Sequence, residues 1–142
     1  MFSLSQTTGY AILALSCLDK GRKKWVILSD IVDRTQIPQP YLVKVLKKLS
    51  LKGLVSTKRG YQGGVSLKRP PTEINLLDVA EAIEGSNVLP DCILGFKKCV
   101  GTSICPTFPF WREERERMRG ELKKITVADL KDPSDRFEDF SI

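Results

Sequence analysis

Three closely spaced cysteines are the residues of this chain with the clearest capacity for chemistry. Cys92, Cys99 and Cys105 follow the spacing C-x6-C-x5-C in a glycine-containing stretch. Because thiolates select soft metals, these donors suit zinc or an iron-sulfur cluster. Zinc sites usually contain tight C-x2-C pairs, which this sequence lacks, so the spacing favours a cluster. Zinc binding and cluster-free, redox-active thiols are the alternative chemistries, and a loop without function is a third.

No fourth ligand for such a cluster is obvious in the sequence. The chain contains no histidine, and Cys17 lies in an apolar segment of helical spacing, where a free cysteine usually packs as a small hydrophobe. An oxygen of Asp91, Ser103 or Thr107, a group of a partner subunit or a small molecule could complete the shell. A weakly held fourth position would make the cluster labile, and its loss could reorder the loop and change the geometry of a dimer.

The helices on either side of the cysteines must position them. Residues 86–106 show no regular periodicity, which predicts a loop. Before it, Asn75 is expected to cap a helix that Gly85 closes, and after it a charged helix is predicted from about residue 108 to residue 125. That helix carries an apolar stripe of Trp111, Met118, Leu122 and Ile125. A lone small domain would struggle to cover this stripe, so we predict a dimerisation helix.

The first part of the chain has the pattern of a helix-turn-helix. A first helix is predicted over about residues 3–19, and a short second helix begins at Ser29, whose hydroxyl could cap it. A third helix is expected to begin at Pro40, with an inward stripe of Leu42, Val45, Leu46 and Leu49. Its other faces carry Tyr41, Lys44, Lys47, Lys48 and Lys52. Two short helices joined by a tight turn, the second presenting cations, are typical of DNA-binding proteins.

A β-wing is predicted directly after the third helix. Gly53 should end that helix, and residues 54–58 and 65–68 fit two short strands around a glycine-rich turn. Lys58 and Arg59 lie where the tip of a hairpin could enter a minor groove. The alternative is an exposed hairpin with solvated basic residues.

The positive charge is concentrated in the N-terminal half of the chain. The net charge is +6, yet residues 1–71 hold 13 Lys and Arg against 3 Asp and Glu, whereas residues 72–142 hold 10 against 14. The basic half should therefore face a polyanion such as double-stranded DNA. A merely soluble basic surface is the alternative explanation of this asymmetry.

The sequence disfavours several other classes of protein. The longest apolar run, residues 10–18, is far shorter than the roughly 20 residues that a bilayer requires, and residues 1–9 lack the Lys or Arg of a signal peptide. We therefore expect no membrane segment and a cytoplasmic protein with reduced thiols. An enzyme is disfavoured because histidine, a Gly-x-Ser-x-Gly motif and a phosphate-binding glycine loop are missing. An electron carrier would hold its cluster with four cysteines and would not need a basic helix and wing.

Four segments resemble the bacterial Rrf-type regulators. They are T-x-G-Y-A-I-L-A-L at residues 7–15, residues 37–42, the wing motif G-L-V-x-x-x-R-G-x-x-G-G at residues 53–64, and residues 79–85. The resemblance covers about residues 3–125 and implies a winged helix with a long dimerisation helix. It implies operator contacts by Tyr41, Lys44, Lys47, Arg59, Gln62, Gly63 and Gly64. It also matches the three clustered cysteines to the cluster ligands of the family.

Two positions depart from the ligand schemes of the family. Some members place a histidine three residues after the last cysteine, where this chain has Phe108. Others use an acidic residue from the first helix of the partner subunit, where this chain has Gly9. Neither scheme transfers intact, so the cluster type stays open between 2Fe-2S and 4Fe-4S.

Together these patterns predict a mainly α-helical chain with a small β-wing. The expected parts are a winged helix-turn-helix DNA-binding domain at residues 1–85, a cluster-binding loop at 86–106, a dimerisation helix and C-terminal helix at 107–131, and a flexible acidic tail at 132–142. The predicted protein is a homodimeric transcription regulator that binds a palindromic operator and senses iron, redox or nitric oxide status through an iron-sulfur cluster. A cluster-free thiol-based or zinc-binding regulator of the same fold is the alternative. The predicted DNA-binding residues are Gln39, Tyr41, Lys44, Lys47, Lys48, Lys58, Arg59, Gln62, Gly63 and Gly64.

Overall fold

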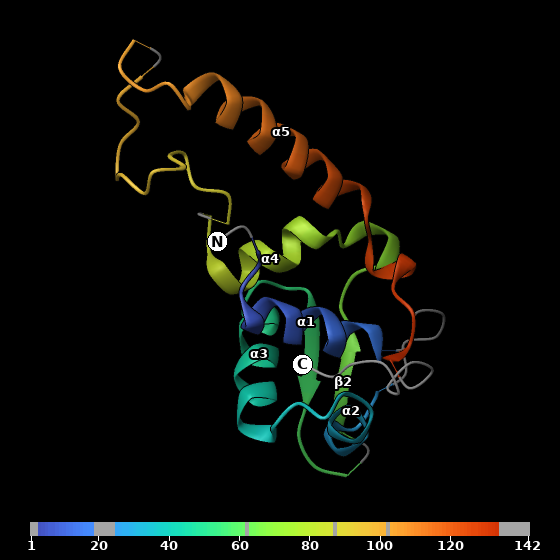
Figure 1. Ribbon diagram of the computed structural model, residues 1–142. Coiled ribbons are helices and arrows are strands. Elements are labelled where there is room, and N and C mark those ends of the chain that lie inside the picture. Colours follow the sequence, from blue (N-terminus) through green and yellow to red (C-terminus); the bar gives the residue numbers. More distant parts are fainter. Residues whose placement is uncertain (1–2, 19–24, 62, 87, 102, 134–142) are drawn as a thin grey trace.

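A long helix, α5 (Phe108–Lys124), projects from a head that holds the other helices and a two-stranded sheet (Figure 1). The computed structural model describes residues 3–18, 25–61, 63–86, 88–101 and 103–133. The elements of the head are α1 (Gln6–Ser16), α2 (Leu28–Thr35), α3 (Gln39–Leu51), β1 (Val55–Lys58), β2 (Gly64–Leu67), η1 (Pro71–Glu73), α4 (Leu76–Glu84) and η2 (Val127–Asp129). The mainly helical architecture with a small antiparallel sheet confirms the predicted fold class.

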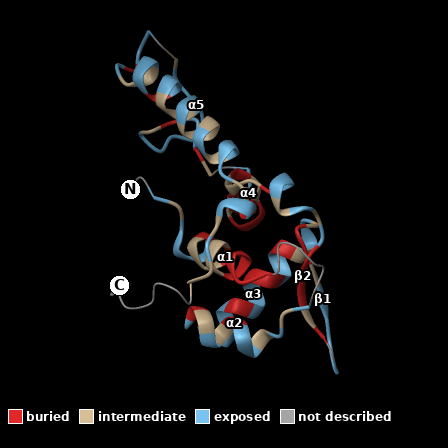
Figure 2. Ribbon diagram, turned by 90° about the vertical axis from the view of Figure 1, so that its right-hand side faces the viewer, coloured by how far each residue is buried: buried red, intermediate tan, exposed pale blue. Residues whose placement is uncertain are grey.

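The hydrophobic core lies where α1 meets α3 and α4. Leu15 of α1, Val79 of α4 and the four apolar positions predicted for α3 are all buried in it. Figure 2 shows this concentration of buried residues in the head, whereas α5 is largely exposed or intermediate. One side of α3 therefore packs in the core, and the opposite side of that helix faces solvent.

α1 is shorter than its apolar pattern predicts. It begins after Ser5, whose hydroxyl accepts a hydrogen bond from the Thr8 amide at 3.1 Å, and its last residue is Ser16. The buried Thr8 hydroxyl donates to the Glu84 carboxylate at 2.8 Å, which ties the start of α1 to the end of α4. Burial opposes ionisation of Glu84, but hydrogen bonds from Ser5 and Thr8 outweigh it and lower the pKa of that carboxyl.

The predicted start of α2 is wrong by one residue. The helix begins at Leu28 with Ile27 in the capping position, and no side chain caps its first turn. Ser29 cannot be the cap because it already lies inside that turn. The turn to α3 passes through Gln36, which adopts a left-handed conformation with φ 57°, and through the buried Ile37.

α3 starts at Gln39, so Pro40 occupies the second helical position and not the first. The Pro38 carbonyl accepts hydrogen bonds from the amides of Tyr41 and Leu42 at 3.0 and 3.1 Å, which fixes this start. Gly53 follows the helix with φ 74°, a conformation that glycine adopts without a steric penalty, and so ends it as predicted.

The wing is a pair of antiparallel strands with a third segment beside β2, close to the turn. The register runs from Val55 opposite Leu67 to Lys58 opposite Gly64. Val26 adds a bridge to Val65 through two backbone hydrogen bonds of 2.9 and 2.8 Å. This bridge fixes the wing to the segment just before α2, and hence to the helix-turn-helix.

Asn75 and Asp78 form a reciprocal capping box at the start of α4. The Asn75 side chain accepts from the Asp78 amide at 2.9 Å, and the Asp78 carboxylate accepts from the Asn75 amide at 3.1 Å. Replacing Asn75 by Ala should lower the free energy of unfolding by about 1 kcal/mol, since it leaves an amide of the first turn without its acceptor. Urea unfolding measures this loss. Asn75→Ser, which keeps a capping oxygen, should lose much less, and equal midpoints for the two variants would contradict the assignment.

α5 buries the smallest share of its residues among the α-helices of the described chain. Trp111 is its one buried residue, and Met118 and Leu122 are half-buried. Ile125, just after its end, is 40% exposed. The predicted apolar stripe is thus partly open within one chain. Among the described residues, no helix combines the length and apolarity needed to cross a membrane.

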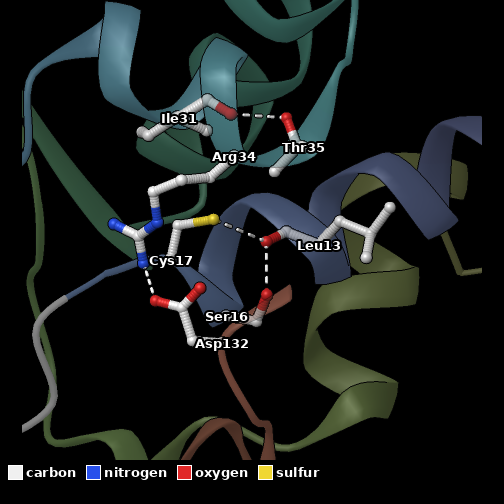
Figure 3. Close-up of polar contacts among 7 residues, drawn as sticks. All are labelled: Leu13, Ser16, Cys17, Ile31, Arg34, Thr35 and Asp132. Atoms are coloured by element: carbon white, nitrogen blue, oxygen red, sulfur yellow. Dashed lines mark hydrogen bonds and ion pairs between the residues drawn. The ribbon is translucent and has the colours of Figure 1, made fainter. Parts of the chain in front are cut away.

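The segment after α5 returns to the head and is fixed there. The Ile125 carbonyl accepts from the Leu76 amide, and the amide of the fully buried Val127 donates to the Ile74 carbonyl, both at 2.9 Å. Further along, Asp132 forms an ion pair with Arg34 of α2, close to the buried Cys17 (Figure 3). The end of α5 is therefore connected to both α4 and the first helix of the helix-turn-helix.

Candidate nucleic-acid interface and cysteine loop

The outer side of α3 is polar, basic and open to solvent. The side chains exposed there are Gln39, Tyr41, Val43, Lys44, Lys47, Lys48 and Leu51. At 3.6 residues per turn, Gln39, Val43 and Lys47 follow one another along the same line of the helix surface. In Figure 1 no other element covers this side of α3. The helix can therefore enter a groove without rearrangement of the head.

Two of the predicted DNA-binding side chains of α3 are held by the head. The ring of Tyr41 packs against Tyr10 of α1, with a centroid distance of 6.3 Å and an angle of 52° between the ring planes. The Lys48 ammonium donates to the Ile83 carbonyl in α4 at 3.4 Å. Both residues thus lie on the flank of α3 that faces α1 and α4, whereas Lys44 and Lys47 point away from the core.

The wing turn presents a second basic group at the same end of the head as the start of α3 (Figure 1). Lys58 and Arg59 are exposed, and Tyr61 at the tip is 93% exposed. Gln62, predicted to contact DNA, lies outside the described residues. Sequence patterns singled out the basic residues of this turn but not Tyr61, although its place directly after Gly60 could have indicated a tip position.

The two wing glycines are required by close backbone packing. A Cβ on Gly63 would lie 2.3 Å from the Lys58 carbonyl oxygen, and its amide donates to the Gly60 carbonyl at 2.9 Å. A Cβ on Gly64 would lie 2.3 Å from the Val26 carbonyl oxygen. Their predicted DNA contacts are therefore accompanied by a structural role, which is to hold the wing turn in shape.

The basic residues of this surface carry charge that the described acidic residues do not neutralise. None of Lys44, Lys47, Lys58 and Arg59 forms an ion pair with a residue that the structure describes. By contrast, Arg115, Arg117 and Arg119 of α5 all pair with acidic groups. Uncompensated cations gathered on one side of a domain are what a phosphate backbone attracts.

The three clustered cysteines differ in their surroundings. Cys92 and Cys105 are buried, whereas Cys99 is exposed and accepts a hydrogen bond from the Gly101 amide at 3.4 Å. The Thr107 hydroxyl, 3.0 Å from the Cys105 sulfur, lowers the pKa of that thiol. Within the described ranges, no three Cys, Asp or Glu side chains are grouped closely enough to hold a metal ion. The structure therefore does not bring the three thiols together in this conformation.

None of the oxygen donors considered as a fourth cluster ligand is placed with all three clustered cysteines among the described residues, and Cys17 lies in the core of the head. Asp91 forms an ion pair with Arg115 at 2.9 Å, and Thr107 contacts Cys105. Ser103 is exposed. Cys17 is buried in the head, where burial raises the pKa of its thiol and its sulfur lies 3.5 Å from the Leu13 carbonyl (Figure 3). Its predicted position as a core residue is confirmed.

The first part of the cysteine loop is fastened to α5. The Trp111 indole donates to the Pro90 carbonyl at 2.8 Å, and the Arg115 guanidinium donates to the Leu89 carbonyl at 2.9 Å. Beside these contacts, a half-open groove of about 540 Å³ lies between the loop and α5. Its apolar lining includes Leu4, Leu89, Cys92, Trp111, Met118 and Leu122. Movement of the cysteine loop would thus act directly on α5.

Comparison with known proteins identifies the family of this fold and surface. A family described as Rrf2, iron-dependent transcriptional regulator, matches residues 4–133. The chain belongs to the Rrf2 family of transcriptional regulators. The Rrf2 proteins are regulators and not enzymes, and the expected resemblance is confirmed.

Individual Rrf2 relatives match most of the chain. An HTH-type transcriptional regulator of Aquifex aeolicus is 31% identical over 128 residues, which is 89% of each chain. The regulator IscR of Serratia proteamaculans is 36% identical over 105 residues, covering 74% of this chain and 63% of its own. Among solved structures, T. potens IscR shares the fold with a TM-score of 0.69 and 27% identity, covering 90% of this chain and 85% of its own.

Proposed function

We propose that this Rrf2 protein binds a palindromic double-stranded operator as a homodimer, with α3 in the major groove and the wing in the adjacent minor groove. The observation that carries the proposal is the set of unpaired cations on α3 and on the wing turn, which lie on an otherwise uncovered side of the head. Helix-turn-helix proteins dock in this way, and their two-fold symmetry is mirrored in the operator. The residues we assign to this surface are Gln39, Tyr41, Lys44, Lys47, Lys58 and Arg59.

The open apolar stripe of α5 supports the homodimer. Trp111 is already buried within one chain, but Met118, Leu122 and Ile125 remain partly exposed beside the groove. Exposed apolar surface of this kind marks a protein-protein interface. A second copy of α5 offers the same stripe, so a two-fold contact would cover both at once.

Removal of the wing cation tests the DNA contact. Arg59→Ala should weaken operator binding by about 1 to 3 kcal/mol, because it deletes a cation placed to enter the minor groove. Fluorescence anisotropy with a duplex selected by the protein from a random pool measures this loss. Lys123→Ala, which removes an equal charge from the exposed end of α5, is the matched control and should bind as the wild type does. Equal affinities for Arg59→Ala and the control would count against the wing contact.

A comparison of two adjacent lysines tests the placement of α3. Lys47 points away from the core, whereas the Lys48 ammonium is directed to the Ile83 carbonyl. We expect Lys47→Ala to lower the slope of log affinity against log salt by about 1, as for one lost phosphate contact. Lys48→Ala should leave the slope close to that of the wild type. The reverse result would mean that α3 is rotated about its axis in the complex.

We further propose that Cys92, Cys99 and Cys105 bind an iron-sulfur cluster that senses iron, redox or nitric oxide status. Three thiols in one loop fit this group chemically, and the family description and the name IscR among the relatives support it. The three thiols are not grouped, so binding requires the loop to bring them together. The cluster would supply a centre that links distant parts of the loop while it is intact. The second candidate is a cluster-free thiol-based or zinc-binding regulator. The exposure of Cys99 and the separation of the thiols favour its thiol-based form, because zinc would require the same assembly of the thiols as a cluster.

A further inference from the structure

An apolar side chain stands among the polar groups of the outer side of α3. Val43 is 48% exposed, although α3 buries Leu42, Val45, Leu46 and Leu49; Leu51, the last residue of the helix, is its other exposed aliphatic residue. Val43 belongs neither to the hydrophobic core nor to the partly buried residues packed against it. Its neighbours one turn away along the helix are Gln39 and Lys47, both exposed. Val43 is therefore not one of the side chains that hold the head together.

The major groove of DNA offers an apolar group that the Val43 side chain could contact. Base edges there present hydrogen-bond donors and acceptors, with a single apolar exception, the C5-methyl group of thymine. Valine has no polar group that could read a donor or acceptor. Its β-branched side chain is restricted to essentially one rotamer in a helix, so it loses little freedom when it makes a contact. Val43 is thus suited to a methyl group and to no other feature of a base edge.

We propose that Val43 is a specificity-determining residue that contacts the C5-methyl group of a thymine in each half-site of the operator. This inference rests on the proposed function, because it requires α3 to lie in the major groove. Gln39 precedes Val43 by one turn, and glutamine can form two hydrogen bonds with adenine. The line from Gln39 to Lys47 therefore reads an A·T-containing step, with Val43 selecting the strand that carries the methyl group at its position.

Removal of the methyl group alone tests the proposal. Operators are first selected by the wild-type protein from a random duplex pool, and each thymine of the selected half-site is then replaced singly by uracil. Uracil keeps every hydrogen-bonding group of thymine and lacks only the C5-methyl. One thymine of the half-site should respond: its replacement by uracil should weaken binding by the wild type about three- to five-fold, which is the effect of one buried methyl group. A 5-methylcytosine at that position, paired with guanine, should bind more tightly than cytosine.

Variants of the side chain give the second arm of the test. Val43→Ala should bind thymine and uracil operators equally, whereas Val43→Thr, which keeps one γ-methyl, should retain part of the difference. Because Val43 is on the surface, both variants should unfold at the wild-type temperature and keep the wild-type salt slope. The proposal is overturned if no thymine responds to uracil, or if Val43→Ala responds as strongly as the wild type. If Lys47→Ala and Arg59→Ala also bind normally, the proposed docking of α3 and the wing fails as well.

Discussion

Anaerobically purified Cys99→Ala is expected to lack the visible absorption of an iron-sulfur cluster that the wild-type protein shows. Cys99 is exposed and its sulfur accepts a hydrogen bond from the Gly101 amide in the loop, so its removal should leave the packing of the head unchanged. A loss of colour would then report a lost ligand and not a misfolded protein. Absorption spectra together with iron and sulfide analysis measure the effect, which we expect to be close to complete.

The fourth cysteine provides the control for this experiment. Cys17 is buried in the head beside the Leu13 carbonyl, away from the loop. Cys17→Ala should therefore keep the colour of the wild type, with some loss of stability from the smaller side chain. If the wild-type protein is colourless and contains zinc, the cluster proposal is wrong and the zinc-binding alternative holds. Protein free of any metal that still responds to oxidants would support the thiol-based alternative.

Replacing Gly64 by Val is expected to cause the largest loss of stability of any single change in the wing. Gly64 has a φ of 148°, and a Cβ there would lie 2.3 Å from the Val26 carbonyl oxygen. The side chain must break the bridge between Val26 and Val65 or displace β2, so we expect a cost of about 3 kcal/mol or more. Urea unfolding measures it, and operator binding should fall with the loss of the wing.

A second glycine separates backbone strain from the steric clash. Gly60 has a φ of 89°, and a Cβ there meets nothing within 4 Å. Gly60→Ala should therefore cost only the conformational penalty, about 1 kcal/mol. If Gly64→Val were no more destabilising than Gly60→Ala, the close approach of the wing to Val26 would not exist in solution.

The features that local sequence fixes could be predicted. The inward stripe of α3 followed from apolar residues three and four apart, and the end of that helix followed from Gly53. The capping box of α4 was visible as Asn75, although its partner Asp78 was not recognised. The start of α2 was predicted wrongly because residue type alone was used. Ser29 is a good capping residue by type, but the helix begins one residue earlier, at Leu28.

The features that depend on distant segments could not be predicted. Lys48 is one more cation by sequence, and only the packing of α3 on α4 places its ammonium at the Ile83 carbonyl, 35 residues away. The bridge of Val26 to the wing and the ion pair of Arg34 with Asp132 likewise join segments without a shared pattern. In the cysteine loop, no periodicity constrains the path of the chain, so spacing could suggest the donors but not their separation.

We propose that the cations of α3 and the wing turn, which form no ion pair with the described residues, hold the head on DNA so that α3 selects one sequence in preference to others. The most direct measurement compares the affinities for a selected operator and a scrambled duplex of equal length across a range of salt concentrations, for the wild type and for Lys47→Ala/Arg59→Ala. We expect the wild type to prefer the operator by about a thousand-fold or more and to weaken steeply with salt. The double variant should bind both duplexes more weakly because a phosphate contact of Lys47 is lost, and it should lose about 1 to 3 kcal/mol of the preference through Arg59. Equal affinity for the two duplexes, or unchanged preference in the double variant, would contradict the account.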